Sequence, residues 1–146
     1  MSVVQTFSDR VSFKALAISL AIYVALSAVL LAVLVVLWMP SGVPAEGFEQ
    51  LAQTDLTLLL WQNILGVVMG VLCGYLAARL SGAHGLRNSL AAGVLVTLFG
   101  VPAIYLHPSH PLLMKIGILV LPIPLMLLGG WIALRRAKLA GGRDHA

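Results

Sequence analysis

Charge is scarce in this chain, and its scarcity excludes a soluble globular domain. Of the 146 residues, 10% are charged and 60% are hydrophobic, whereas a soluble domain has about 25% charged and about 45–50% apolar residues. The mean hydropathy of +1.02 also excludes an intrinsically disordered chain, because such chains are polar and highly charged. The composition therefore predicts a small integral membrane protein with one membrane domain over residues 1–146.

Cysteine is almost absent, and acids and bases are missing from the apolar runs. The single Cys73 excludes an intrachain disulfide and the paired thiols of vitamin K-type quinone reductases. The lack of a charge inside the runs excludes a membrane-embedded proton relay, including the carboxylate that small four-helix multidrug exporters need. All four histidines lie outside the runs, which excludes axial haem ligands. We therefore expect a non-enzymatic protein with no catalytic residue and no cofactor.

Four uncharged apolar runs are long enough to cross a bilayer, for which a helix needs about 20 residues. These runs cover residues 15–39, 56–78, 88–106 and 116–134. The first run is longer than the apolar region of a signal peptide, so we interpret it as an uncleaved anchor. The predicted fold class is all-α, a four-span transmembrane bundle that runs up-down-up-down. The remaining segments are two outer loops at 40–55 and 107–115, an inner loop at 79–87 and a tail at 135–146.

The basic residues predict the orientation of this bundle. Of the nine Lys and Arg residues, all but Lys115 flank the spans on the side of the two termini. Because basic flanks stay in the cytoplasm, we predict that both termini are cytoplasmic. The net charge of +4 is then explained by the orientation of the chain in the membrane, and we expect no nucleic-acid partner. The residues expected to contact lipid headgroups are Arg79, Arg87, Arg135, Arg136 and Lys138.

Small residues recur at four-residue spacing, which lets membrane helices approach closely, as in GxxxG motifs. The helix-packing residues predicted in the second and third runs are Gln62, Gly66, Gly70, Gly74, Ala78, Gly93 and Thr97. The first run has a similar stripe of Ala17, Ala21, Ala25, Ala28 and Ala32. We expect intrachain packing around a central second run, with little volume left for a cavity. The alternative is that the glycine face packs against another copy or another protein.

Two further features of the runs have a structural and a functional interpretation. Gln62 and Asn63 are carboxamides within the second run, and they either tie helices together or, with Thr97, form a polar lining. Pro122 and Pro124 interrupt the fourth run, and we expect a kink there because each proline removes an N–H donor. Neighbouring helices or Ser and Thr hydroxyls must then satisfy the freed carbonyls.

The only metal-like pattern is the His-Pro-Ser-His segment from His107 to His110. Zinc needs three or four ligands, so an acid such as Glu46 or Asp55 from the same outer side would have to join. A proline-stiffened turn that leads into the fourth span is the favoured interpretation of the segment. We therefore predict no metal site and keep His107 and His110 as the weaker alternative.

The stretch from Gly70 to Gly93 carries a recurring pattern of small, aromatic and basic residues. The matching positions are Gly74, Tyr75, Ala77, Arg79, Gly82, Gly85 and Gly93. This stretch resembles a helical hairpin of small bacterial four-helix integral membrane proteins of unassigned function. The resemblance covers only this part of the chain. It implies a bacterial inner (cytoplasmic) membrane and a four-helix fold, and it implies no activity.

These observations predict a non-catalytic structural or accessory protein within a larger membrane assembly. Its expected partners are membrane lipids and other membrane-protein subunits or further copies of itself. The alternative is a homo-oligomeric small transporter or channel for a neutral or weakly polar solute, lined by Gln62, Asn63 and Thr97. A membrane enzyme or metal protein built on the outer loops is the third hypothesis.

Overall fold

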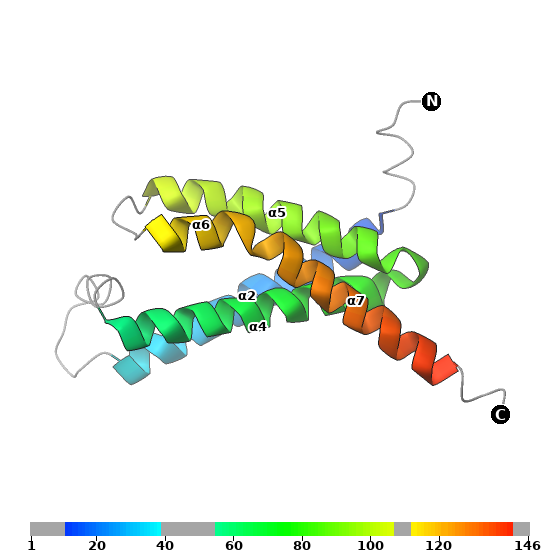
Figure 1. Cartoon of the computed structure of the whole chain (residues 1–146), viewed down its shortest axis with the longest axis horizontal. Helices are drawn as coiled ribbons and strands as arrows, with labels where there is room; N and C mark the ends of the chain where they lie inside the picture. Colours follow the sequence, from blue (N-terminus) through cyan, green and yellow to red (C-terminus); the bar gives the residue numbers. More distant parts are fainter. Residues whose placement is uncertain (1–10, 39–54, 107–111, 142–146) are drawn as a thin grey trace.

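The computed structural model describes residues 11–38, 55–106 and 112–141, and all regular structure in these ranges is helical. Successive long helices run in alternating directions along a common axis (Figure 1). Three helices are long and apolar enough to cross a membrane, and a bent pair makes a fourth if it counts as one span. The elements are α2 (Phe13–Trp38), α4 (Leu56–Ser81), η1 (Gly82–His84), α5 (Gly85–Leu106), α6 (Leu112–Val120) and α7 (Pro122–Gly141).

The link between α4 and α5 is shorter than the predicted inner loop at 79–87. Helix α4 begins at an N-cap, Asp55, whose carboxylate accepts hydrogen bonds from the N–H groups of Thr57 and Leu58. It continues through Arg79 to Ser81 and stops at Gly82, whose φ of 60° suits glycine. Only the single turn η1 separates it from α5, so most of the predicted loop is helical.

The fourth span also exceeds its predicted bounds at both ends. Helix α6 begins at Leu112, so Lys115 lies in a helix instead of the outer loop predicted at 107–115. Helix α7 continues to Gly141, so the predicted tail at 135–146 begins as helix. Alanine, leucine, arginine and lysine favour helix strongly, and the segment after Leu134 consists largely of these residues.

The predicted proline kink is confirmed. Helices α6 and α7 meet at a bend of 46°, at Leu121 and directly before Pro122. The Thr97 hydroxyl of α5 donates a hydrogen bond of 3.4 Å to the Leu119 carbonyl oxygen just before the bend. A threonine from a neighbouring helix therefore contacts the backbone beside the bend, but at Leu119 and not at Ile118 or Val120, the carbonyls that the sequence predicts to be freed by the two prolines.

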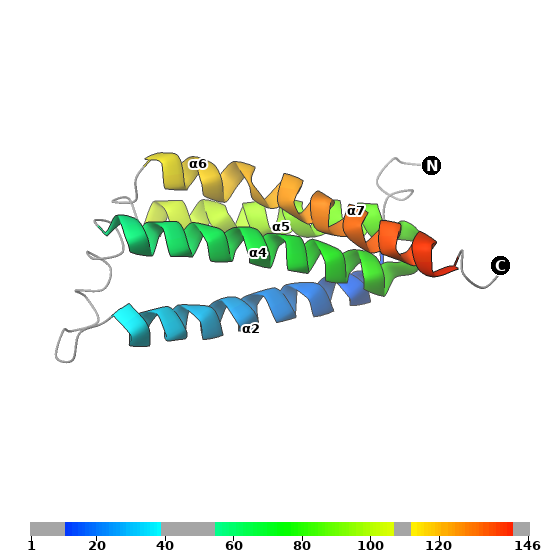
Figure 2. The ribbon, with the colours of Figure 1, turned by 60° about the horizontal axis from the view of Figure 1, so that its bottom comes forward.

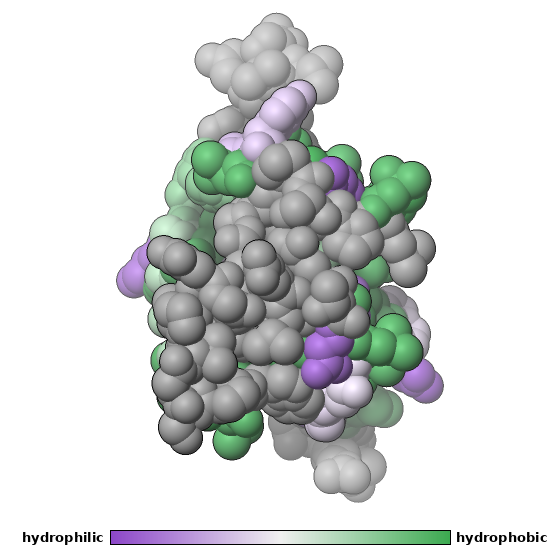
Figure 3. Space-filling view, turned by 90° about the vertical axis from the view of Figure 1, so that its left-hand side faces the viewer, coloured by the Kyte–Doolittle hydropathy of each residue, from purple (hydrophilic) through white to green (hydrophobic). Residues whose placement is uncertain are grey.

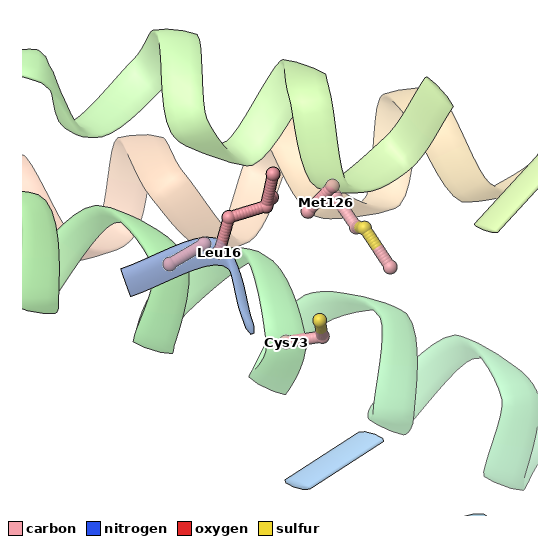
Figure 4. Packing of buried hydrophobic residues seen from close by; sticks show 5 residues of the cluster. Leu16, Cys73 and Met126 are labelled. Atoms are coloured by element: carbon pink, nitrogen blue, oxygen red, sulfur yellow. The ribbon is translucent and has the colours of Figure 1, made fainter. Parts of the chain in front are cut away.

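Helix α4 is the centre of the bundle, as predicted. It packs most extensively against α7, and it also contacts α5 and α2, whereas α2 has its main contact with α4. Leu16 of α2, Cys73 of α4 and Met126 of α7 converge in a small buried cluster (Figure 4). Ala77 and Ala92 complete this cluster, so the helices are joined around small side chains.

The bundle is closed at one end and forked at the other. At the closed end, which we call the basic end, α2 begins, η1 links α4 to α5, and α7 ends (Figure 1). Towards the opposite end, called the far end, the pair α5–α6 diverges from the pair α2–α4 (Figure 1). Figure 2 shows that α2 also moves away from α4 in this direction. Seen from the far end, the described residues that are visible include both hydrophobic and hydrophilic ones (Figure 3).

Candidate functional site

Glycines bring α4 and α7 into backbone contact near the middle of the bundle. A Cβ added at Gly74 would overlap the Met126 carbonyl oxygen, and one added at Gly129 would overlap the Val71 carbonyl oxygen. A Cβ at Gly70 would lie 3.1 Å from the Leu125 Cβ. Because only glycine permits such an approach, these residues fix how closely α4 and α7 pack.

The first half of α7 also packs closely against α5. A Cβ at Gly93 would lie 2.9 Å from the Ile123 Cα, and one at Gly130 would overlap the Ser89 hydroxyl. This buried hydroxyl lies 2.8 Å from the Gly74 carbonyl oxygen and 3.0 Å from the Gly85 carbonyl oxygen, so its proton bridges α5 and α4. Helices α4, α5 and α7 thus pack closely together at Ser89, in the centre of the bundle.

Sequence reasoning missed the contribution of α7 to this packing. Gly129 and Gly130 were not among the predicted packing residues, although both are buried. The signal was present, since Gly129 and Ala133 have the same four-residue spacing as the glycines of α4.

A cavity of about 320 Å³ lies on the far-end side of this closely packed region, where the pair α5–α6 diverges from the pair α2–α4. The expectation that close packing leaves little volume was therefore wrong for this half of the bundle. The cavity forms because the Gly70 and Gly74 contacts with α7 end there: a Cβ at Gly66 would meet no atom within 4 Å. Its lining is mainly apolar and includes Val67, Val96, Phe99, Ile118, Leu121 and Leu125.

Gln62 and Asn63 both line this cavity. Their positions differ, because the Asn63 amide is exposed and donates a hydrogen bond of 2.7 Å to the Leu59 carbonyl oxygen. The Gln62 Oε1 atom is buried and accepts no hydrogen bond from the described residues. Gln62 also lines a second cavity of about 180 Å³ between α2 and α4, so its carboxamide lies between two cavities.

Thr97 does not belong to the residues that line either cavity. Of the three residues considered as a polar lining, Gln62 and Asn63 are brought together, whereas Thr97 contacts Leu119 at the bend. Its spacing from Gly93 placed it correctly on the inner face of α5. The sequence alone could not show that this hydroxyl would donate a hydrogen bond to the backbone near the break between α6 and α7.

The alanine stripe of α2 faces away from the other described helices. The residues of α2 turned towards α4 are buried or half-buried, among them Ser19, Tyr23 and Leu34. The five stripe residues are all exposed: Ala17, Ala21, Ala25, Ala28 and Ala32. Only 6% of the most apolar window of α2 is buried, against 22% for α4 and 24% for α5, so α2 is the least buried of the three helices that are long enough to span a membrane.

Asn88 ties the start of α2 to α5, a role that sequence reasoning did not assign. The Asn88 Oδ1 atom accepts a hydrogen bond of 3.1 Å from the Ser12 N–H. Asn88 is fully buried, and its Nδ2 atom has no hydrogen-bond acceptor within the part of the chain that the structure describes. This hydrogen bond joins two residues that are far apart in the sequence and connects the start of α2 with α5 at the basic end.

Charged side chains mark the two ends of the bundle. The described basic residues at the basic end are Lys14, Arg79, Arg87, Arg135, Arg136 and Lys138. Arg79 donates a hydrogen bond of 3.3 Å to the Tyr75 hydroxyl, and the Arg135 guanidinium lies 5.2 Å from the Trp131 ring centroid. Both arginines are therefore held beside aromatic side chains at the helix ends, as at a membrane interface.

The described ranges contain no group of three His, Cys, Asp or Glu residues that could hold a metal ion. His107 and His110 lie outside these ranges, so the weaker metal hypothesis stays a hypothesis. The described cavity lining has no Asp, Glu, Lys, Arg or His, and its polar side chains are those of Tyr23, Gln62 and Asn63 in an otherwise apolar wall. In comparisons with protein-family models, curated proteins and solved structures, nothing matches this chain.

Proposed function

We propose that this protein is a non-catalytic accessory subunit that packs within a larger assembly in the membrane. The exposed alanine stripe of α2 carries this proposal. Helices in lipid associate through close packing of small residues, and the described helices leave this stripe exposed. A helix of another subunit is the partner we propose for it, and a second copy of this chain is the alternative partner.

The proposal includes a membrane topology. The helices cross the bilayer four times, with α6 and α7 as one bent span, and both termini lie in the cytoplasm. The gathering of basic side chains at one end of the bundle supports this orientation. The membrane we propose is the inner membrane of a bacterium, which rests on the resemblance of the Gly70–Gly93 hairpin described above.

The second candidate is a small homo-oligomeric transporter or channel. The position of Gln62 and Asn63 on the cavity favours it, since these are the carboxamides considered for a polar pathway. A neutral or weakly polar solute is the substrate class, because the lining offers no charge to an ion.

Native mass spectrometry of the protein, extracted from its own membrane in mild detergent, tests the first proposal. We expect particles that contain other subunits in a fixed ratio. The Ala25→Trp variant places a large ring on the stripe and should lower the yield of these particles severalfold. Leu26→Trp is the matched control, because Leu26 is exposed but lies on another face of α2.

A closed homo-oligomer without other subunits would contradict the accessory role and leave the second candidate. Solute flux into liposomes, measured with the native chain and with Gln62→Leu and Asn63→Leu, would then decide whether the oligomer conducts. Equal assembly of the Ala25→Trp and Leu26→Trp variants would show that the stripe is not the contact surface.

A further inference from the structure

We propose that the larger cavity is a binding site for one straight acyl chain of a membrane phospholipid, which enters it sideways from the hydrocarbon core of the bilayer. This inference is independent of the accessory role, since the alanine stripe contributes no residue to the cavity lining. It rests on the position of the opening, on the width of the cavity and on two glycines that packing within the bundle does not require.

The cavity is open on the flank of the bundle, at the depth of the membrane interior. Val67 of α4, Phe99 of α5 and Leu121 at the bend all line it, and the exposed fractions of these residues are 39%, 72% and 42%. Val67 lies about 17 Å from the far-end start of the 26-residue helix α4. The hydrocarbon core of a bilayer is about 30 Å thick, so the surroundings of this opening are lipid chains and not water.

The polar side chains of the described lining give no reason for a polar ligand. The Asn63 amide donates a hydrogen bond to the Leu59 carbonyl oxygen, and the Tyr23 hydroxyl has Ser27 of its own helix as a hydrogen-bond partner. The Gln62 Oε1 atom has almost no accessible surface, so a molecule in the cavity cannot reach it. The other lining residues have no polar side chain. A hydrocarbon chain therefore occupies this space without the loss of a hydrogen bond.

The dimensions of the cavity favour one hydrocarbon chain over a helix of another protein. Along α4 the lining extends from Gln62 to Gly70, a rise of about 12 Å. The volume of about 320 Å³ over this length gives a mean width of roughly 6 Å. Non-bonded carbon atoms pack at about 4 Å, so a single file of methylene groups fits, whereas a helix of about 10–12 Å in diameter does not.

Two glycines on the walls of the cavity keep this space open. A Cβ at Gly66 of α4 would meet no atom within 4 Å, and one at Gly117 of α6 would meet only the Leu121 side chain, at 3.6 Å, an ordinary contact. Packing among the described residues therefore requires glycine at neither position, in contrast to Gly74. Since glycine is unfavourable inside a helix, the open space itself is the feature that these two residues provide.

The test is photolabelling of the full chain in phosphatidylcholine liposomes that contain a trace of phosphatidylcholine with a diazirine in one acyl chain. The label is compared between wall residues, the half-buried Ile118 and Leu125, and surface residues, the exposed Ile64 and Leu98 outside the lining. We expect label on both sets, because the chains around the bundle reach the surface residues and one chain reaches the wall.

The host lipid shows whether the wall label comes from a narrow site. Diphytanoyl phosphatidylcholine has methyl-branched chains, which are wider than a single file of methylene groups. In this host the straight-chain probe should meet less competition for the cavity, so the ratio of wall label to surface label should rise severalfold over that in a straight-chain host. An equal ratio in both hosts, or surface label without wall label, would overturn the proposal.

A variant that fills the cavity gives the second measurement. Gly66→Leu directs a side chain into open space and should abolish the wall label while the surface label stays. Val68→Leu enlarges an exposed residue of the same helix outside the lining, and it should keep both labels. Equal wall labelling of the Gly66→Leu and native chains would contradict the site. The comparison of host lipids uses the native chain, so it remains decisive even if a variant fails to fold.

Discussion

Two glycines on the same face of α4 have opposite surroundings, and this contrast gives a test at the residue scale. Gly74→Ala places a Cβ against the Met126 backbone, so α4 and α7 must separate. We expect a loss of about 2 kcal/mol in the free energy of unfolding, as for other overpacked sites. The measurement is unfolding in mixed micelles, followed by circular dichroism while the fraction of denaturing detergent increases.

Gly66→Ala is the control for this substitution. It has the same chemistry and lies two turns away, but its new methyl group meets no atom within 4 Å. We expect unchanged stability or a gain of up to about 1 kcal/mol, because alanine restricts the unfolded chain more than glycine does. Equal losses at both positions would contradict the packing described here.

A second prediction at this scale concerns the Ser89 hydroxyl. Ser89→Ala removes the hydrogen bond between α5 and the Gly74 carbonyl oxygen, and we expect a loss of about 1 kcal/mol. Ser81→Ala removes a bond within the last turn of α4, to the Ala78 carbonyl oxygen, and should cost less. The same detergent titration compares the two, and a larger loss for Ser81→Ala would refute the bridging role of Ser89.

The spacing of small residues predicted the packing face of α4 but not which of its glycines makes contact. Gly66, Gly70 and Gly74 are equivalent in the sequence pattern, and only the crossing of α4 and α7 makes Gly74 crowded and Gly66 open. The cavity follows from the same crossing. Gln62 was predicted as a candidate from its residue type, whereas the missing donor at Oε1 depends on side chains from several helices.

At the scale of the helices, the bend between α6 and α7 gives the next prediction. Replacing both Pro122 and Pro124 with alanine restores two N–H donors and allows one continuous helix. The α6 segment would then swing away from α5, and the cavity would change shape. Spin labels at Leu106 and Ile116, both exposed, should report a change of several ångströms in their separation.

Pro102→Ala is the control for this experiment. Pro102 also lies inside a helix, α5, which continues past it. We expect the label separation to stay as in the native chain. An unchanged separation in the double variant as well would show that the packing of α7 against α4 and α5, and not the prolines, produces the bend.

Sequence reasoning located the helices well because apolar runs have sharp ends. The predicted start of the second span at residue 56 coincides with the start of α4, where Asp55 caps the helix. It did less well where polar residues continue a helix: α4 includes Arg79 and α7 includes Lys138. A charged residue marks the end of the apolar run, and a helix can continue beyond it into the interface.

At the scale of the whole molecule, the charge asymmetry predicts the orientation. With Cys73→Ala as the background, because Cys73 is the only cysteine, Leu56→Cys and Leu139→Cys place single thiols at the far end and the basic end. An impermeant maleimide should label the first in intact cells and the second only after permeabilisation. The reverse pattern would contradict the proposed cytoplasmic position of the basic end.

The three-residue link η1 has a consequence for how the protein enters the membrane. Three residues reach roughly 10 Å when extended, which is about the distance between the axes of two packed helices. Helices α4 and α5 are therefore held side by side at this end, and we expect them to enter the membrane together as a helical hairpin. The pairing that we expect first is thus between two helices that are adjacent in the chain, and it presents one hairpin surface to α2 and α7.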